Sequence, residues 1–196
     1  MRRKIEKANP SQKILVTAFE CLSTRGYANV SMRDIANEAD VALSQLTYYY
    51  NSKEKLFIEV ISVMINQYLS EIEGRLKAAS NTRDKIASLI KFFKELTIDR
   101  PNLLRLFIDF TAQALWLPSF REQVDSLFNS ITEMIEKNIL LDNMKVDTWA
   151  HEYSSKAIAR LILGAFYGTS IQIMLGFDDD KKSAFESLNL MESFIN

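Results

Sequence analysis

Apolar side chains recur every three to four positions along most of this chain, which is the spacing of one face of an α-helix. The periodic stretches are short up to Tyr50 and predict three short helices there. Longer helices are predicted over Ser52–Ser80, Thr82–Asp99, Pro101–Trp116, Ser119–Asn143, Asp147–Gly176 and Asp179–Phe194. Only five glycines and three prolines occur in 196 residues, too few for the many turns of a β-sandwich or barrel. The sequence therefore predicts an all-α fold.

The ends of the first two short helices carry local signals. Asn9 is a capping residue, and Pro10 after it has the backbone angle of a first helical turn. Gly26 follows the last apolar position and predicts the end of this helix. Ser31 and Asp34 have the spacing of a capping box, in which each side chain binds a free backbone N–H group. A second helix is therefore predicted to begin next to Ser31.

A tight turn at Asp40 and Val41 separates the second short helix from a third one, predicted over Ala42–Tyr50. Val41 and Leu46 have inward positions in this pattern, whereas polar side chains occupy other faces of the third helix. Two short helices joined by a tight turn are typical of a helix-turn-helix motif. In such motifs the second helix lies in the major groove of DNA, so we expect the third helix to be the recognition helix.

Residues 10–60 resemble the DNA-binding region of the TetR-type bacterial transcriptional regulators. The matching positions are Ile14-Leu15, Ala18-Phe19, Gly26-Tyr27, Val30-Ser31-Met32, Ile35-Ala36, Ala39, Val41, Leu46, Tyr48-Tyr49-Tyr50 and Ser52-Lys53-Glu54-Lys55-Leu56. The resemblance covers about a quarter of the chain. It implies a three-helix helix-turn-helix domain in residues 1–52, with a basic arm at 1–8, and a helical ligand-binding and dimerisation domain in residues 53–196.

Four positions depart from the pattern of this family. Asp40 stands where the turn usually has Gly, and it tolerates left-handed backbone better than most other residues. Ala42 stands where a Ser or Thr commonly caps the recognition helix, so a cap is lost. Ser44 replaces a frequent Gly, and Thr47 replaces the first of the usual tyrosines. These departures concern the operator contacts rather than the motif itself.

Candidate base contacts lie on the third helix. The amide of Gln45 can donate and accept together, which suits adenine, and the methyl group of Thr47 or the side chain of Leu43 can contact a thymine methyl. The resemblance extends the expected contacts to the cap of the second helix and the start of the next helix. The full set of expected DNA-binding residues is Ser31, Met32, Arg33, Ala42, Leu43, Ser44, Gln45, Thr47, Tyr48, Tyr49 and Lys53.

Within this set, phosphate contacts are expected from Lys53, from Ser31 and from the phenol groups of Tyr48 and Tyr49. Successive aromatic side chains cannot all face one way on a helix, so part of the tyrosine triplet must have another role. Tyr50 is expected to pack inward, because the family usually has Phe at this position.

The charge of the chain is unevenly distributed. The whole chain has 24 basic and 25 acidic side chains, a net charge of −1. Residues 1–55 hold nine of the basic and six of the acidic ones, a net of +3, which leaves −4 for the remainder. The basic arm at residues 1–8 either follows the minor groove of DNA or is a solubilising chain end. The positive end of the chain is compatible with binding to phosphates.

One cysteine and one histidine exclude a disulfide framework and a zinc site of Cys and His ligands. We expect Cys21 to be a small buried side chain, and His151 to be exposed or to line a pocket. The chain has no glycine-rich phosphate loop, no Gly-x-Ser-x-Gly and no His-Glu-x-x-His. We therefore predict no catalytic residue, no metal, no cofactor and no enzymatic activity.

Two further features predict a cytoplasmic protein with no membrane partner. The first residues are basic but are not followed by the apolar stretch of a secretory signal. The longest apolar stretch, Leu161–Leu175, is shorter than the roughly 20 residues that span a bilayer, and it contains Thr169, Ser170 and Gln172.

The predicted helix over Asp147–Gly176 is apolar on nearly every side, so it must be covered all round. One face carries mostly small residues, which allow close approach of another helix. The resemblance implies that this other helix belongs to a second copy, because the last two long helices of the family form the four-helix bundle of a homodimer. Tight packing within one chain is the alternative. The expected dimer residues are Ser154, Ala157, Leu161, Gly164, Ala165 and Gly168.

Aromatic side chains are concentrated in the second half of the chain, and most must belong to the core. The resemblance implies an effector cavity between helices, the usual place for a ligand in a bundle. The expected lining residues are Phe107, Asp109, Phe110, Gln113, Trp116, Trp149, Tyr153, Phe166 and Tyr167. Asp109, Gln113 and Trp116 share one helix face, which suits a cationic aromatic ligand; the alternative is an exposed ion pair between Arg105 and Asp109.

The resemblance as a whole implies a dimeric regulator, expected to be a repressor, that binds a palindromic double-stranded DNA operator. A small apolar or amphipathic effector would release it by favouring a conformation with wrongly spaced recognition helices. Two alternatives remain open. One is a helix-turn-helix regulator without a small-molecule effector. The other is a helical ligand-binding or enzymatic bundle whose DNA-binding motif has decayed, as the residues at Ala42, Ser44 and Thr47 hint.

Overall fold

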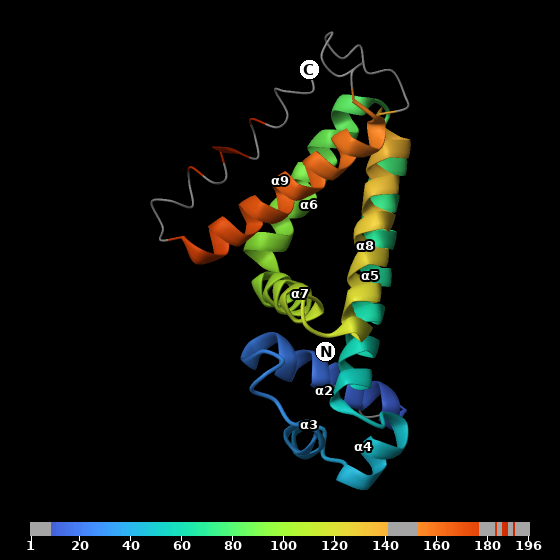
Figure 1. Cartoon of the computed structure of the whole chain (residues 1–196), viewed down its shortest axis with the longest axis vertical. Helices are drawn as coiled ribbons and strands as arrows, with labels where there is room; N and C mark the ends of the chain where they lie inside the picture. Colours follow the sequence, from blue (N-terminus) through green and yellow to red (C-terminus); the bar gives the residue numbers. More distant parts are fainter. Residues whose placement is uncertain (1–8, 141–152, 177–182, 184–185, 188–189, 191–196) are drawn as a thin grey trace. The chain divides into compact units, whose positions relative to one another are not determined.

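The computed structural model describes residues 9–140, 153–176, 183, 186–187 and 190. Figure 1 shows its elements, which are in chain order α2 (Pro10–Arg25), α3 (Met32–Glu38), α4 (Leu43–Tyr49), α5 (Lys53–Ala78), α6 (Thr82–Asp99), α7 (Pro101–Ala114), α8 (Pro118–Ile135), the π-helical segment η1 (Glu136–Leu140) and α9 (Ser155–Leu175). Each of these elements is a helix, and no strand occurs in the described part of the chain. The predicted all-α fold is confirmed.

Most predicted helix ends agree with the observed ones to within two residues, and α6 has the predicted bounds. α8 is shorter than predicted, because the α-helix ends at Ile135 and η1 follows it. α9 begins at Ser155, where the side chain of Ser154 accepts a backbone hydrogen bond from the first turn and caps the helix. The predicted start at Asp147, together with most of the predicted helix Asp179–Phe194, lies outside the described residues.

The chain divides into two compact units. The first unit comprises Met1–Asn66 and Asn102–Val124, and the second comprises Gln67–Pro101 and Asp125–Asn196. The domain boundary predicted after residue 52 therefore does not coincide with the division between the units. The first unit also includes the start of α5, nearly all of α7 and the start of α8.

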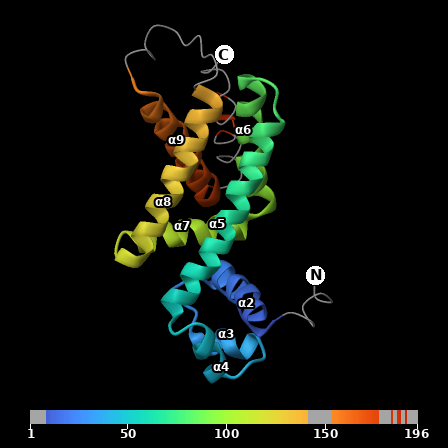
Figure 2. The same cartoon turned by 90° about the vertical axis from the view of Figure 1, so that its right-hand side faces the viewer.

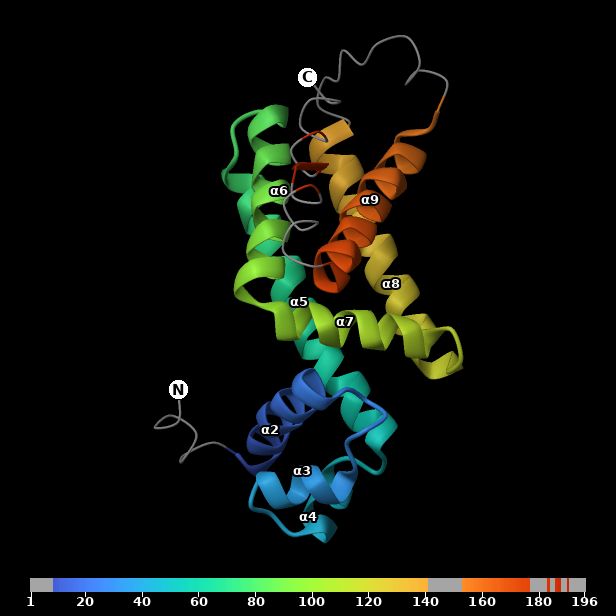
Figure 3. The same ribbon diagram turned by 90° about the vertical axis from the view of Figure 1, so that its left-hand side faces the viewer.

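In the first unit, α2, α3 and α4 contact one another (Figure 3). Asn9 Oδ1 accepts a hydrogen bond from the Ser11 N–H at the start of α2, and Gly26 ends this helix with a φ of 81°. The capping box of α3 is confirmed, since Ser31 Oγ accepts from the Asp34 N–H at 3.2 Å and the Asp34 carboxylate accepts from the Ser31 N–H at 2.8 Å. These hydrogen bonds lower the pKa of Asp34.

An aromatic cluster forms the centre of the first unit. The ring of Phe57 on α5 stacks on the ring of Tyr27, with 4.7 Å between the two centroids. Phe110 of α7 and Phe120 of α8 meet Phe57 edge-on, at 5.4 and 5.3 Å. All three phenylalanines are fully buried. Because buried aromatic rings remove much apolar surface from water, this cluster fixes α7 and the start of α8 to the same core as α5.

The second unit has a separate core, in which α9 packs against α6 and η1. Phe93 of α6 and Phe166 of α9 lie face to face, with 4.2 Å between their centroids and 8° between their planes. Both rings are buried, and Leu163 and Ile173 join them from α9. Ser170 of α9 is also buried, and its hydroxyl has no hydrogen-bond partner among the residues that the structure describes. Thr97 and Thr132 are also buried in this unit, and their hydroxyls donate to the carbonyls of Phe93 and Phe128.

Two arginines and two glutamates link α5 to α6 in the second unit. Arg75 contacts Glu71 at 2.7 Å and Glu95 at 2.5 Å, while Arg100 contacts Glu71 at 2.9 Å. Burial alone would raise the pKa of Glu71, but the two guanidinium groups hold it below its ordinary value. The hydrogen bond from Arg75 likewise lowers the pKa of Glu95. The four charges thus neutralise one another across the two helices.

α9 is both long and apolar. It is 21 residues long, with a mean hydropathy of 1.4 in its most apolar window, so by length and composition it could cross a membrane. Among the residues that the structure describes, no other helix is long and apolar enough to cross a membrane. α9 includes the predicted apolar stretch Leu161–Leu175 and is six residues longer at its start. A core helix of a soluble protein has the same composition, and a third of this window is buried. The composition alone is therefore weak support for a membrane role.

Candidate nucleic-acid interface

The turn between α3 and α4 is centred on Asp40. Its φ of 49° makes it the one non-glycine residue with a positive φ in the described part of the chain. Asp tolerates this left-handed backbone better than most residues, and the tight turn predicted at Asp40 and Val41 is confirmed. The Val41 N–H donates to the Ala36 carbonyl at 3.0 Å and tightens the turn. Ala42 then precedes α4 without any side-chain cap, as predicted.

α4 presents a neutral surface to solvent, because none of its side chains is charged. Leu46 is fully buried and anchors the helix in the core of the first unit. Ser44, Thr47 and Tyr48 are exposed, and Gln45 is half-buried. The exposed fraction of Tyr48 is 81 %. The surface expected to face DNA is thus open to contact along one side of this short helix.

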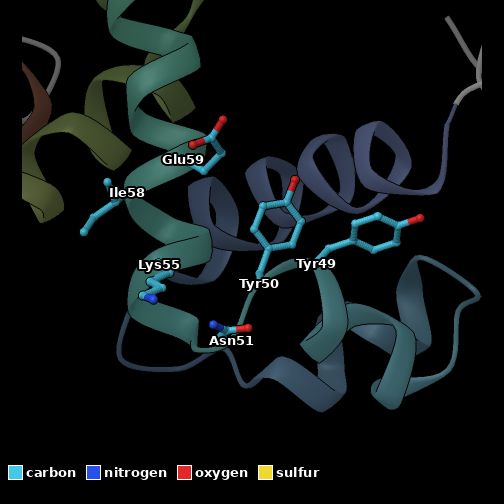
Figure 4. A pocket seen from close by; sticks show the side chains of 6 residues that line it. All are labelled: Tyr49, Tyr50, Asn51, Lys55, Ile58 and Glu59. Atoms are coloured by element: carbon cyan, nitrogen blue, oxygen red, sulfur yellow. The ribbon is translucent and has the colours of Figure 1, made fainter.

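The three tyrosines at the end of α4 have different environments. Tyr50 is buried, with its phenol oxygen 2.8 Å from Ser11 Oγ of α2, so the predicted inward packing is confirmed. Tyr48 and Tyr49 are exposed, as a phosphate contact requires. Figure 4 shows Tyr50 pointing from the end of α4 toward α2, next to a hollow beside the start of α5. This hollow of about 390 Å³ is lined by Tyr49, Tyr50, Asn51, Lys55, Ile58 and Glu59.

Lys53 lies at the start of α5, and its ammonium group is held by an aromatic ring. The Nζ atom lies 4.1 Å from the centre of the Tyr27 ring, a cation–π contact. Burial lowers the pKa of Lys53, whereas the carboxylates of Asp109 and Asp34 act in the opposite direction. The lysine expected to contact phosphate is therefore positioned by the loop between α2 and α3, which carries Tyr27.

Asp109 of α7 fixes this same loop. Its Oδ2 atom accepts a hydrogen bond from the Tyr27 N–H at 2.6 Å, and its Oδ1 atom accepts one from the Gln113 side chain at 3.3 Å. Arg105 instead donates to Asn102 at 3.1 Å. The alternative of an exposed ion pair between Arg105 and Asp109 is therefore wrong, since the carboxylate binds a backbone group. Sequence reasoning missed this role of Asp109.

The expected contact residues of α3 lie at its N-terminal end. Ser31 is exposed, and its hydroxyl donates to Asp34 Oδ2 at 2.6 Å as part of the cap. Met32 is half-buried, whereas Arg33 is exposed. Contact of these residues with DNA stays a prediction. The basic arm at residues 1–8 lies outside the described residues.

The residues expected to line an effector cavity are spread over both units. Phe107, Asp109, Phe110, Gln113 and Trp116 belong to the first unit, and Tyr153, Phe166 and Tyr167 to the second. Trp149 and His151 lie outside the described residues. Phe110 and Phe166 are core residues of their units, and Trp116 is 82 % exposed. The role of the whole set in binding an effector stays a prediction.

α9 keeps an exposed apolar face, on which several of the expected dimer residues lie. Leu161 is 69 % exposed and Leu175 is 79 % exposed, and Ala157 and Gly164 are exposed on the same helix. Open space lies beside Gly164 and Gly168, because an added Cβ atom would meet nothing within 4 Å. Nothing in the described chain covers this face at these two glycines.

A groove of about 390 Å³ lies between α8 and α9, which run next to each other in Figure 2. The rings of Phe128 and Tyr167 meet edge-on there, with 5.8 Å between their centroids. Gly164, one of the expected dimer residues, also lines the groove. Ser154 is the cap of α9, and Ala165 is half-buried. The complete lining is Asp125, Phe128, Asn129, Thr132, Arg160, Leu163, Gly164 and Tyr167.

Cys21 is only 2 % exposed, so the predicted buried position is confirmed. Its Sγ donates to Glu38 Oε2 at 3.2 Å. Burial, together with the nearby Glu38 carboxylate, raises the pKa of the thiol to about 11. Within the ranges that the structure describes, no group of three His, Cys, Asp or Glu side chains is arranged to hold a metal ion.

Comparisons with known proteins agree with this geometry. A family model described as bacterial regulatory proteins, tetR family, matches residues 14–60, which span α2 to the start of α5. The chain is 21 % identical over 198 residues to the HTH-type transcriptional regulator LuxR of Vibrio harveyi, covering all of this chain and 91 % of that one.

Two solved structures show the same fold. A transcriptional regulator from Streptomyces coelicolor A3(2) has a TM-score of 0.76 at 20 % identity, with 96 % of this chain and 99 % of that one covered. A transcriptional regulator from Saccharomonospora viridis in complex with choline has a TM-score of 0.77 at 18 % identity, with 93 % and 95 % covered. The relatives are regulators and not enzymes. Residues 14–60 are therefore a DNA-binding region of the tetR family of bacterial regulatory proteins, and the chain as a whole is similar to helix-turn-helix transcriptional regulators.

Proposed function

We propose that this regulator is a cytoplasmic homodimeric repressor that binds a palindromic operator and is released by a small apolar or amphipathic effector. The observation that carries the DNA-binding part is the exposed, uncharged face of α4, held behind the Asp40 turn by the buried Leu46. A short helix presented in this way is suited to the major groove. The expected DNA-binding residues of α3, α4 and the start of α5 all belong to the same unit.

The exposed face of α9 supports a homodimer. Leu161 and Leu175 leave large apolar side chains in water, and Gly164 and Gly168 leave room for a neighbouring helix. Burial of such a face against its own copy would remove apolar surface and place two recognition helices in one complex. Two half-sites are also needed, because one helix of seven residues reads few base pairs.

Support for a small-molecule effector comes from one relative. The structure from Saccharomonospora viridis is a complex with choline, a cationic ligand. A carboxylate and an aromatic ring together would recognise such a cation, and both side chains occur among the residues expected to line the pocket. A regulator without an effector and a bundle with decayed DNA binding remain the alternatives.

Footprinting on the DNA upstream of the gene for this chain tests the proposal. We expect protection of two half-sites related by a two-fold axis, lost on addition of choline or of a long-chain amphiphile. The variant Leu46→Ser, which places an unpaired hydroxyl in a fully buried position, is a negative control for the fold of α4. Protection that no ligand changes favours the regulator without effector. Absence of any sequence-specific protection overturns the proposal as a whole.

Native mass spectrometry of the purified protein separates these outcomes further. A ligand retained through purification adds its mass to the dimer and identifies the effector class. A bare dimer that still binds the upstream DNA supports control without a small molecule. A monomer at micromolar concentration contradicts the proposed homodimer.

A further inference from the structure

The recognition helix lacks the side chains that usually read guanine. Guanine is most often recognised by Arg or Lys, which donate to its O6 and N7 atoms in the major groove. α4 has no cation, and over residues 31–49 of the motif Arg33 is the one cationic side chain. Arg33 belongs to α3 and not to α4. Base reading by α4 must therefore use neutral groups.

The hydroxyl of Thr47 donates its proton within the helix, so it has no proton left to donate to a base. The Oγ1 atom lies 2.9 Å from the Leu43 carbonyl and 3.1 Å from the Ser44 carbonyl. The residue is exposed. With the hydroxyl engaged in this way, the Cγ2 methyl is the part of the side chain left for an apolar contact.

Leu43 adds a second apolar group next to this methyl. It is 37 % exposed and lies four residues before Thr47, so the two side chains are neighbours on one helix face. In the major groove, the apolar feature that distinguishes one base pair from another is the C5-methyl of thymine. Gln45 complements them, because its amide suits adenine, the partner of thymine.

We propose that α4 selects A·T base pairs by contact of Thr47 and Leu43 with thymine methyl groups, and that the half-site beneath this helix contains no guanine read by α4. This inference rests on the proposed DNA-binding function and names the class of sequence that the site takes. The hydroxyl of Ser44 can bond to either kind of base pair, so it adds little discrimination. Any guanine contact by a cationic side chain of residues 31–49 falls to Arg33 of α3.

The test begins with selection of bound duplexes from a random library by the full-length protein. Thymines of the selected half-site are then replaced one at a time by deoxyuridine, which lacks only the C5-methyl group. Dissociation constants are measured by fluorescence anisotropy at one salt concentration. We expect about fourfold weaker binding for each contacted thymine, which corresponds to about 0.8 kcal/mol for one buried methyl group.

Variants of the threonine identify the contact. Thr47→Ser removes the methyl and should lose the discrimination at the thymine that Thr47 contacts, with discrimination at a thymine contacted by Leu43 retained, whereas Thr47→Val keeps a methyl and should still distinguish thymine from deoxyuridine at both positions. Thr24→Ser is the matched control, because exposed Thr24 on α2 makes the same pair of bonds, to the Glu20 carbonyl at 2.7 Å and the Cys21 carbonyl at 3.1 Å. It should leave the discrimination unchanged.

The outcomes separate this inference from the function on which it rests. Specific binding to a half-site with G·C pairs beneath α4 overturns the inference alone, as does equal affinity for thymine and deoxyuridine duplexes. Discrimination retained at every contacted thymine in Thr47→Ser overturns the assignment to this residue. If the selection enriches no sequence, the proposed operator binding fails and the inference fails with it.

Discussion

The two units differ most in what their exposed helices show to the surroundings. In the first unit, α4 has one buried anchor, Leu46, and presents hydroxyl, amide and phenol groups to solvent. In the second unit, α9 is apolar even on its exposed side, where Leu161 and Leu175 are 69 % and 79 % exposed. A polar exposed face can form its hydrogen bonds with water. An apolar exposed face is different, because covering it lowers the free energy. The first helix is suited to reading DNA and the second to packing against a protein.

The cores of the two units also differ, in their aromatic contacts and in their hydrogen bonds. The first core contains a cluster of rings around Phe57, which Phe110 and Phe120 meet edge-on, and the carboxylate of Asp109 accepts a hydrogen bond from the α2–α3 loop. In the described part of the second core, Phe93 stacks on Phe166, and the hydroxyl of buried Ser170 has no hydrogen-bond partner. The first core is thus tied by a hydrogen bond to the loop that carries Tyr27, whereas the charged contacts of the second unit join α5 to α6. The following predictions test this difference, from the largest expected effect to the smallest.

Phe57→Ala should cost about 3–5 kcal/mol of unfolding free energy, because a fully buried ring at the centre of the first unit is lost. Urea unfolding followed by circular dichroism measures this change. Val63→Ala on the same helix is the control, since Val63 is 52 % exposed and should change stability by less than about 0.5 kcal/mol. A loss below about 1 kcal/mol for Phe57→Ala would show that the ring cluster is not the core.

Leu161→Arg should weaken the proposed dimer about a hundredfold, which is about 3 kcal/mol, because a charge would be placed in a covered apolar face. Sedimentation equilibrium gives the dissociation constant. Ile98→Arg on α6 is the control, since Ile98 is 61 % exposed but lies off α9. Equal dimer stability in the two variants would mean that the α9 face is not the interface.

Asp109→Ala should cost about 2 kcal/mol, because the Tyr27 N–H loses a charged hydrogen-bond acceptor at 2.6 Å. Hydrogen exchange should show a faster-exchanging Tyr27 amide, and the change should be confined to the first unit. Gln113→Ala, which removes the other partner of Asp109, should cost less, since that contact is 3.3 Å long and joins two side chains. Unchanged protection of the Tyr27 amide in Asp109→Ala would contradict the role given to this carboxylate.

Lys53→Ala should weaken binding to every DNA sequence alike and reduce the slope of log K against log salt concentration by about 0.9, as expected for one lost phosphate contact. Lys91→Ala is the control, because Lys91 lies in the second unit and its side chain is 74 % exposed. A slope that does not change in Lys53→Ala would place the ammonium group on the Tyr27 ring in the complex as well as in the free protein.

The smallest effect concerns Cys21, whose pKa is raised from 9.0 to about 11. Because the fold favours the neutral thiol, this contribution to stability is fully present below pH 9 and is lost as the pH rises through 11. At pH 8 the native protein should react with iodoacetamide far more slowly than the same protein unfolded in urea. Equal rates in the two states would show that the thiol is neither buried nor shifted.

Features with local causes could be predicted from the sequence. The caps at Asn9 and Ser31, the end at Gly26 and the left-handed turn at Asp40 each depend on residues within a few positions of one another. The inward position of Tyr50 followed from the family pattern, and the structure confirms it.

Features that depend on distant residues could not be predicted. The hydrogen bond from the Tyr27 N–H to Asp109 joins positions 82 residues apart, and neither residue has a local pattern that indicates it. The same holds for Phe110 and Phe120, which extend the first unit beyond the predicted boundary after residue 52. Periodicity shows that a helix has an apolar face, but not which other helix covers it.

The most direct test of the account is the specificity ratio of the recognition helix. We would measure dissociation constants for the footprinted duplex and for a scrambled duplex of the same composition, at one salt concentration, with the wild type and a variant carrying Ser44→Ala, Gln45→Ala and Thr47→Ala. The wild type should prefer the footprinted duplex by about 10³ or more. In the variant this ratio should fall toward one at an unchanged unfolding midpoint. A wild-type ratio near one, or a variant that keeps the full ratio, would contradict the claim that α4 reads DNA.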